Sequence, residues 1–112
     1  MAKFKMIVLS SPVPGEEARF NDWYQNTHIP EVLTVPGMQG AQRYRLFAKL
    51  LGSGSNEWLT IYDIESDDPA ALPAAMNEAS TSGKRTRSDS LNISTAYSAL
   101  FSEFGEFISS SG

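Results

Sequence analysis

The order of strand-like and helix-like segments constrains the fold of this chain more than any other feature of its sequence. Strands alternate apolar and polar residues and favour β-branched and aromatic side chains, whereas helices repeat apolar residues every three or four positions. By these criteria the sequence predicts strands at residues 3–10, 41–48, 57–64 and 95–104 and helices at residues 20–28 and 73–80. The order β-α-β-β-α-β predicts an α+β, ferredoxin-like fold with a four-stranded antiparallel sheet.

The length of the chain predicts one domain that spans residues 1–112. A chain of this size, 41% hydrophobic, can bury one core. Two helices can cover only one face of the predicted sheet. An apolar second face is more than a soluble monomer normally exposes, so we predict a homodimer in which a second copy covers the open sheet face.

The composition excludes several classes of function. The chain has no cysteine and one histidine, which leaves no disulfide, no cysteine-ligated metal and no site of several histidines within one subunit. A net charge of -4 argues against nucleic-acid binding. No apolar run approaches the ~20 residues needed to cross a bilayer, and the start does not resemble a signal peptide. We therefore expect a cytoplasmic protein with no metal, no organic cofactor, no nucleic-acid partner and no membrane contact.

The strongest candidate for chemistry is His28, the single histidine, at the end of the first predicted helix. Pro30 disfavours helical geometry in the residue before it, so the helix is expected to stop near His28. The negative end of the helix dipole would then favour protonated His28. Tyr24 lies one turn earlier and is expected to face the same cavity, and Asn21 could orient the imidazole ring. The alternative is an ordinary amphipathic helix with an aromatic core stripe.

The two middle strands supply further candidates for contact with a ligand. Arg43 and Tyr44 point to opposite faces, so at most one of them lines a given pocket. We favour an inter-subunit ion pair for Arg43 over a clamp on a substrate carboxylate. Trp58 and Tyr62 share one face and could form an aromatic wall, or simply belong to the core. The candidate substrate-binding residues are Asn21, Trp23, Arg43, Tyr44, Trp58 and Tyr62.

A basic cluster lies in the polar segment after the second predicted helix. It consists of Lys84, Arg85 and Arg87. Most clusters of this kind are solvated surface, and that is the interpretation we favour. The alternative is a contact with an anionic group of a substrate or partner.

Three stretches of the first half resemble a known family. The run at residues 20–33, the turn at residues 35–38 and the strand start at residues 41–44 resemble the EthD-like branch of the dimeric α+β barrel superfamily. The resemblance implies a ferredoxin-like subunit that pairs through its sheet into a closed barrel, with a pocket between sheet and helices. Relatives include decarboxylases, dehydratases, cyclases and lactone isomerases without cofactor, and quinone-forming monooxygenases.

Together these features predict a cofactor-independent acid–base enzyme for a small aromatic, polyketide-like or lactone substrate. His28 would transfer the proton and Tyr24 would donate a hydrogen bond to an enol or enolate, in an isomerisation, a cyclisation with loss of water or a decarboxylation. Two alternatives stay open. The chain could be a non-catalytic accessory protein that binds a hydrophobic metabolite, or a cofactor-free monooxygenase that oxidises a phenol.

Overall fold

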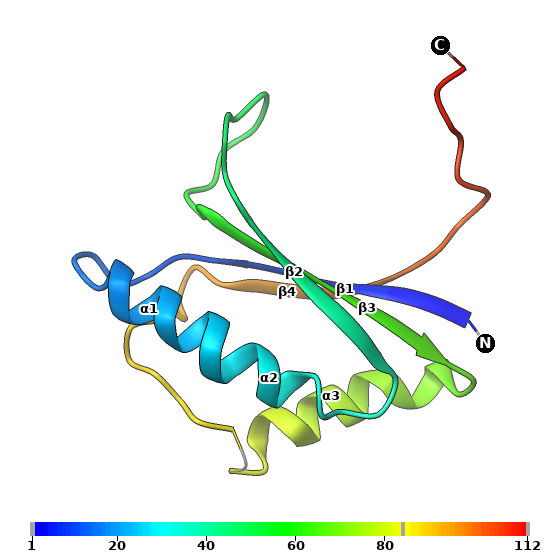
Figure 1. The fold of residues 1–112 in the computed structure, drawn as a ribbon, viewed down its shortest axis with the longest axis horizontal. Coiled ribbons are helices and arrows are strands. Elements are labelled where there is room, and N and C mark those ends of the chain that lie inside the picture. The colour runs from blue at the N-terminus through cyan, green and yellow to red at the C-terminus, as the bar shows by residue number, and fades with distance from the viewer. Residues whose placement is uncertain (1, 84, 112) are drawn as a thin grey trace.

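The computed structural model describes residues 2–83 and 85–111, which form a four-stranded antiparallel sheet with helices on one face (Figure 1). The strands are β1 (Ala2–Ser10), β2 (Met38–Arg45), β3 (Trp58–Ser66) and β4 (Tyr97–Ser102). The helical segments are α1 (Glu17–Trp23), η1 (Tyr24–His28), α2 (Ile29–Val32), η2 (Pro69–Ala71) and α3 (Leu72–Thr81). The strand order β2-β3-β1-β4 confirms the predicted ferredoxin-like fold.

The first helical stretch continues through Pro30, so the prediction that it ends at His28 was wrong. The residues Tyr24–His28 form a π turn, in which the N–H of Ile29 donates to the carbonyl of Tyr24, five residues earlier. In a regular α-helix the ring of Pro30 would clash with the carbonyl four residues before it, and the wider turn relieves that conflict. His28 therefore lies inside a helical stretch that runs on to Val32, away from the negative end of its dipole.

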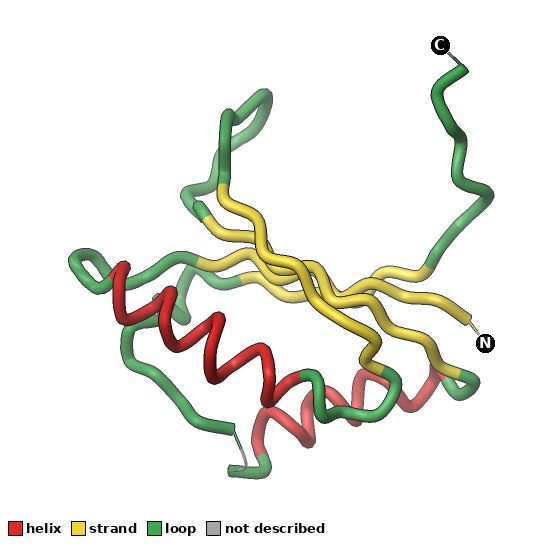
Figure 2. Tube along the Cα trace, viewed as in Figure 1, coloured by secondary structure: helices red, strands yellow, loops and turns green. Residues whose placement is uncertain are grey.

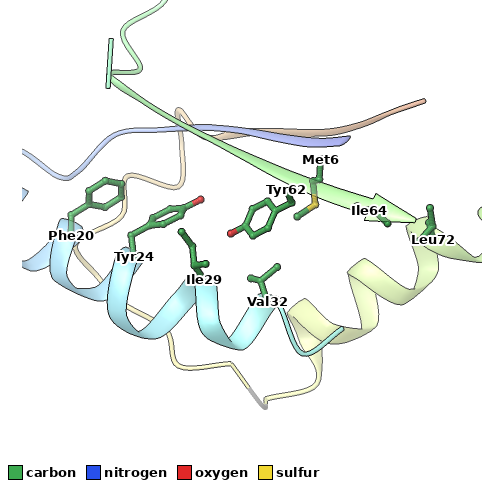
Figure 3. Packing of buried hydrophobic residues seen from close by; sticks show 8 residues of the cluster. All are labelled: Met6, Phe20, Tyr24, Ile29, Val32, Tyr62, Ile64 and Leu72. Atoms are coloured by element: carbon green, nitrogen blue, oxygen red, sulfur yellow. The ribbon is translucent and has the colours of Figure 1, made fainter. Parts of the chain in front are cut away.

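The buried core lies between the sheet and the helical layer (Figures 2 and 3). On the helical side, the π turn inserts one extra position into the apolar stripe, which therefore steps by five residues from Tyr24 to Ile29. On the sheet side, alternate residues of β1 and β3 face the helices. The buried cluster consists of Met6, Phe20, Tyr24, Ile29, Val32, Tyr62, Ile64 and Leu72.

A tight turn fixes where β2 begins. Gly37 has a φ of 98°, a conformation that favours glycine, and a Cβ at this position would lie 2.9 Å from the carbonyl oxygen of Glu65. The Glu65 N–H donates to the Gly37 carbonyl at 2.9 Å, which ties the turn to the end of β3. A β-bulge between Met38 and Gly40 then shifts the register by one residue, which turns Arg43 toward the helices opposite Thr60.

The opposite face of the sheet carries no helix and is partly apolar. It presents a shallow apolar hollow of about 430 Å³, which Ile7, Leu9, Tyr97 and Phe101 line together with three polar or charged residues. The open face that the sequence predicted is therefore present. Within the described residues, no helix is long and apolar enough to cross a bilayer.

Candidate functional site

The main candidate site is a cavity of about 500 Å³ beside the π turn. His28 and Trp23 line it from the helical side, and the segment at residues 85–93 closes it from the other side. The remaining lining residues are Ser80, Arg85, Thr86, Arg87, Ser88, Asp89, Leu91 and Ile93. The π turn thus brings the single histidine against a segment almost 60 positions later in the chain.

Hydrogen bonds hold this segment against the helices. The indole N–H of Trp23 donates to the carbonyl of Thr86 at 2.9 Å. The carboxylate of Glu31 accepts from both the backbone N–H and the hydroxyl of Thr86, each at 2.8 Å. Arg19 pairs with Asp89 at 2.7 Å. The wall of the cavity is therefore attached to α1 and α2 at several points.

The imidazole of His28 is held by two aromatic rings. It stacks on Trp23, with ring centroids 4.6 Å apart and planes inclined by 24°, and it meets Tyr24 edge-on at 4.9 Å. Its Nδ1 is buried and has no hydrogen-bond partner among the described residues. Burial, and next the positive charge of Arg85, lower the pKa of His28 from 6.5 to about 4, against a smaller opposing effect of Glu31. His28 is neutral at pH 7, so the expected protonated form was wrong.

This shift predicts a specific loss of stability in acid. The unfolded chain takes up a proton at His28 below pH 6.5, whereas the folded chain does so only near pH 4, so stability is retained above pH 6.5 and lost as pH falls toward 4. We expect this group to account for about 2–3 kcal/mol of unfolding free energy between those limits. Urea denaturation at several pH values measures it, and His28→Gln should remove that part of the pH dependence.

Arg85 is the site residue that the sequence analysis underestimated. Its guanidinium Nη2 is buried without a hydrogen-bond partner among the described residues. It lines the His28 cavity and also a smaller adjoining cavity of about 210 Å³. Arg85 is thus not plain solvated surface, and its place beside Arg87 in the basic cluster was the signal in the sequence. The third member of the cluster, Lys84, lies outside the described residues.

Tyr24 does not face this cavity, which corrects the predicted His28–Tyr24 pair. The Tyr24 side chain is only 2% exposed, and Figure 3 shows its hydroxyl directed toward that of Tyr62 in the core. The two hydroxyls face each other (Figure 3), Thr60 and Ser10 lie beside that of Tyr24, and burial, the largest effect, raises the pKa of both phenols. The extra residue of the π turn rotates His28 away from the line that a regular helix would give it. Tyr24 packs against His28 through its ring.

Asn21 accepts a hydrogen bond from Arg43 and, contrary to what we expected, does not orient His28. Arg43 projects from β2 toward the helices, and its Nη2 donates to the Asn21 Oδ1 at 2.7 Å. Its guanidinium carbon lies 4.8 Å from the ring centroid of Tyr24 and 4.9 Å from that of Trp58, in the range of cation–π contacts. Arg43 therefore faces away from the open sheet face, and the favoured inter-subunit ion pair was wrong.

The remaining candidates divide between the two faces of the sheet. Trp58 and Tyr62 face the helices together, as their spacing predicted, and both pack against or within the core. Tyr44 lies on the open face and is 48% exposed, so it is remote from the His28 cavity. Of the residues proposed from sequence, Trp23 and His28 line the cavity. Within the described part of the chain, no group of three or more metal-ligating side chains is placed to hold a metal ion.

Comparison with known proteins supports the fold. No protein-family model and no curated protein matches the sequence. Among solved structures, an ethyl tert-butyl ether d (EthD) family protein from Bacillus halodurans C-125 superposes with a TM-score of 0.62 at 22% identity, over 91% of this chain and 99% of that one. A point mutant of MhuD, solved with two manganese protoporphyrin IX bound per active site, gives a TM-score of 0.61 at 18% identity, over 96% and 99%. The chain therefore shares the fold of this EthD family protein and of MhuD, in agreement with the resemblance seen in its sequence.

Proposed function

We propose that this protein is an enzyme in which neutral His28 removes a proton from a small anionic substrate. The observation that carries the proposal is the shared cavity of about 500 Å³, where His28 lies beside Arg85, whose Nη2 is buried with no hydrogen-bond partner among the described residues. A neutral imidazole accepts a proton, and an anionic substrate that neutralises the charge of Arg85 would raise the low pKa of His28 toward the range of an effective base. The same positive charge stabilises the anion that the transfer leaves behind. His28 would accept the proton, and Arg85 would stabilise the anion.

The proposed step moves a proton from a carbon next to a carbonyl group to the imidazole of His28. The electron pair of the broken C–H bond becomes an enolate, whose oxygen carries the negative charge beside Arg85. The imidazolium then returns the proton to another carbon or to a leaving oxygen, which gives an isomerisation or a loss of water. In a decarboxylation the enolate would form as the C–C bond to the carboxylate breaks and CO₂ leaves, and its carbon would take a proton from water, because neutral His28 brings none.

The walls of the cavity support a planar substrate with an acidic group. Trp23, Leu91 and Ile93 provide apolar surface, and Arg85 and Arg87 provide positive charge. Aromatic, polyketide-like or lactone compounds that bear a carboxylate or an acidic phenol combine these properties. The MhuD structure contains manganese protoporphyrin IX, so the fold by itself does not decide between chemistry with and without a cofactor.

The proposal includes a homodimer through the open sheet face. The support is the apolar hollow on that face, together with Tyr44, Tyr97 and Phe101, which are each about half exposed. Analytical ultracentrifugation should give a mass of twice 12.3 kDa at micromolar concentration. A monodisperse monomer at that concentration would contradict this part of the proposal.

Proton NMR of His28 tests the site directly, because the chain has a single histidine and its imidazole signals need no assignment. Free protein should titrate near pH 4. Saturating benzoate should raise this pKa, since a carboxylate neutralises the charge of Arg85. Uncharged benzamide has the same shape and should leave the pKa almost unchanged.

Two outcomes would count against the proposed site. If benzoate and benzamide both leave the His28 signals unmoved, the cavity does not bind planar anions. If benzoate shifts the pKa equally in the Arg85→Met variant, the anion does not bind at Arg85. Compounds that shift the wild-type pKa then form the panel for an activity assay.

A further inference from the structure

Two segments of the chain leave the body of the molecule on the side of the open sheet face. They are the β2–β3 loop, residues 46–57, and the C-terminal tail, residues 103–111, and Figure 1 shows both rising away from the helices. They begin at opposite ends of the sheet. Trp58, which follows the loop, pairs with Ser10, whereas Ser102, which precedes the tail, pairs with Phe4 at the other end of β1.

Both segments carry large apolar side chains that their own subunit leaves in solvent. Three belong to the loop and three to the tail, and each is at least 91% exposed: Phe47, Leu50, Leu51, Phe104, Phe107 and Ile108. The radius of gyration of 15.2 Å exceeds the about 13 Å expected for a compact chain of this length. Six such side chains offer on the order of 1,000 Å² of surface, comparable to one side of a standard interface.

We propose that the tail of one subunit packs on the β2–β3 loop of a second copy of this chain, and reciprocally. A second copy that faces the open sheet lies where both segments already project. A two-fold axis parallel to the sheet and perpendicular to the strands exchanges the two ends of the sheet, so each tail lies at the same end as the partner's loop. The tail starts from β4 and the loop from β2, the two edge strands, which are about 15 Å apart, and the nine residues of the tail can span that distance. The two-fold axis would repeat this contact, so the six apolar side chains of each subunit would all be buried in the dimer.

The charges of the tail and the loop favour this arrangement over the other possible two-fold axis. An axis parallel to the strands would instead set loop against loop and tail against tail. The tail contains Glu103 and Glu106 and no basic residue, while the tip of the loop at residues 47–55 contains Lys49 and no acidic residue. Pairing of tail with loop joins opposite charges, whereas pairing of like with like joins acid to acid and lysine to lysine.

This inference rests on the proposed dimer and is independent of the chemistry at His28. The dimer needs only the sheet face, whereas the inference adds a reciprocal clasp by two named segments. Loss of the clasp is therefore measurable while the sheet contact persists.

Crosslinking between single-cysteine variants tests the clasp, because the natural chain has no cysteine. Leu50→Cys and Phe107→Cys subunits are mixed, allowed to exchange and treated with a short bismaleimide. We expect a covalent species of twice 12.3 kDa in the mixture and almost none with either variant alone. Ala74→Cys on α3, exposed on the helical layer, is the matched control and should not crosslink with Phe107→Cys.

Three other outcomes of crosslinking and ultracentrifugation would contradict the clasp. Crosslinking of each variant to itself would show that like segments meet. A dimer in the ultracentrifuge without any crosslink would leave the sheet contact and remove the clasp, and a monomer would remove both.

As a second measurement, the triple replacement of Phe104, Phe107 and Ile108 by serine should raise the dimer dissociation constant at least about tenfold. Ile93→Ser, which removes an exposed apolar side chain on the opposite side, should not, and equal effects of the two would contradict the clasp.

Discussion

Replacement of His28 by glutamine is expected to lower turnover by about 10²–10⁴-fold, the usual contribution of a positioned general base. Glutamine keeps a polar planar group against Trp23 but cannot hold a proton at neutral pH. Because His28 is already neutral at pH 7, the variant loses no charge interaction there. The fold and the dimer should therefore stay intact, which separates loss of chemistry from loss of structure.

The measurement is the rate of substrate consumption with the compounds that shift the His28 signals, for the wild type and two variants. Gln25→Ala is the matched control, because Gln25 is exposed on the same π turn and does not line the cavity. Its rate should equal that of the wild type. Full activity of His28→Gln would remove His28 as the base, and tight binding without product in the wild type would favour an accessory binding protein.

Most of the fold could be predicted because its information is local. The strand and helix patterns, the Pro36–Gly37 turn and their order define the ferredoxin-like topology. The bulge between Met38 and Gly40 that sets the register of β2 on β3 has no such signal. The π turn could not be predicted, because the rule that proline ends a helix assumes a regular turn. Whether the chain inserts an extra residue depends on how Ile29 and Val32 pack under the sheet, which is a tertiary effect.

The sequence predicted only part of the candidate site, because the site depends on contacts between distant parts of the chain. Trp23 and His28 are both candidates from the sequence, but they are five residues apart, a spacing that a regular α-helix does not bring together. Their stacking depends on the π turn. Arg85 comes from a polar segment whose position depends on the bonds between Thr86 and Glu31, and sequence periodicity says nothing of such bonds. The partner of Asn21 is likewise a residue 22 positions away, Arg43 on β2.

Two replacements of Tyr24 should have very different effects on stability. Tyr24→Ala removes a ring that is 2% exposed and is expected to lower the unfolding free energy by about 3–5 kcal/mol, from lost burial and the cavity left behind. Tyr24→Phe removes only a buried hydroxyl that lies among those of Tyr62, Thr60 and Ser10, so we expect a smaller loss of about 0.5–1.5 kcal/mol. Urea denaturation at pH 7 measures both.

The same pair decides whether Tyr24 belongs to the core or to the chemistry. With the hydroxyl directed at Tyr62 and away from the His28 cavity, Tyr24→Phe should keep wild-type turnover. Tyr62→Phe is the matched variant on the sheet side, since its hydroxyl is equally buried and faces that of Tyr24 (Figure 3). A loss of turnover in Tyr24→Phe as large as that in His28→Gln, with stability unchanged, would instead place the phenol in the reaction. Equal turnover of the two phenylalanine variants and the wild type would leave His28 and Arg85 as the groups through which this cavity acts.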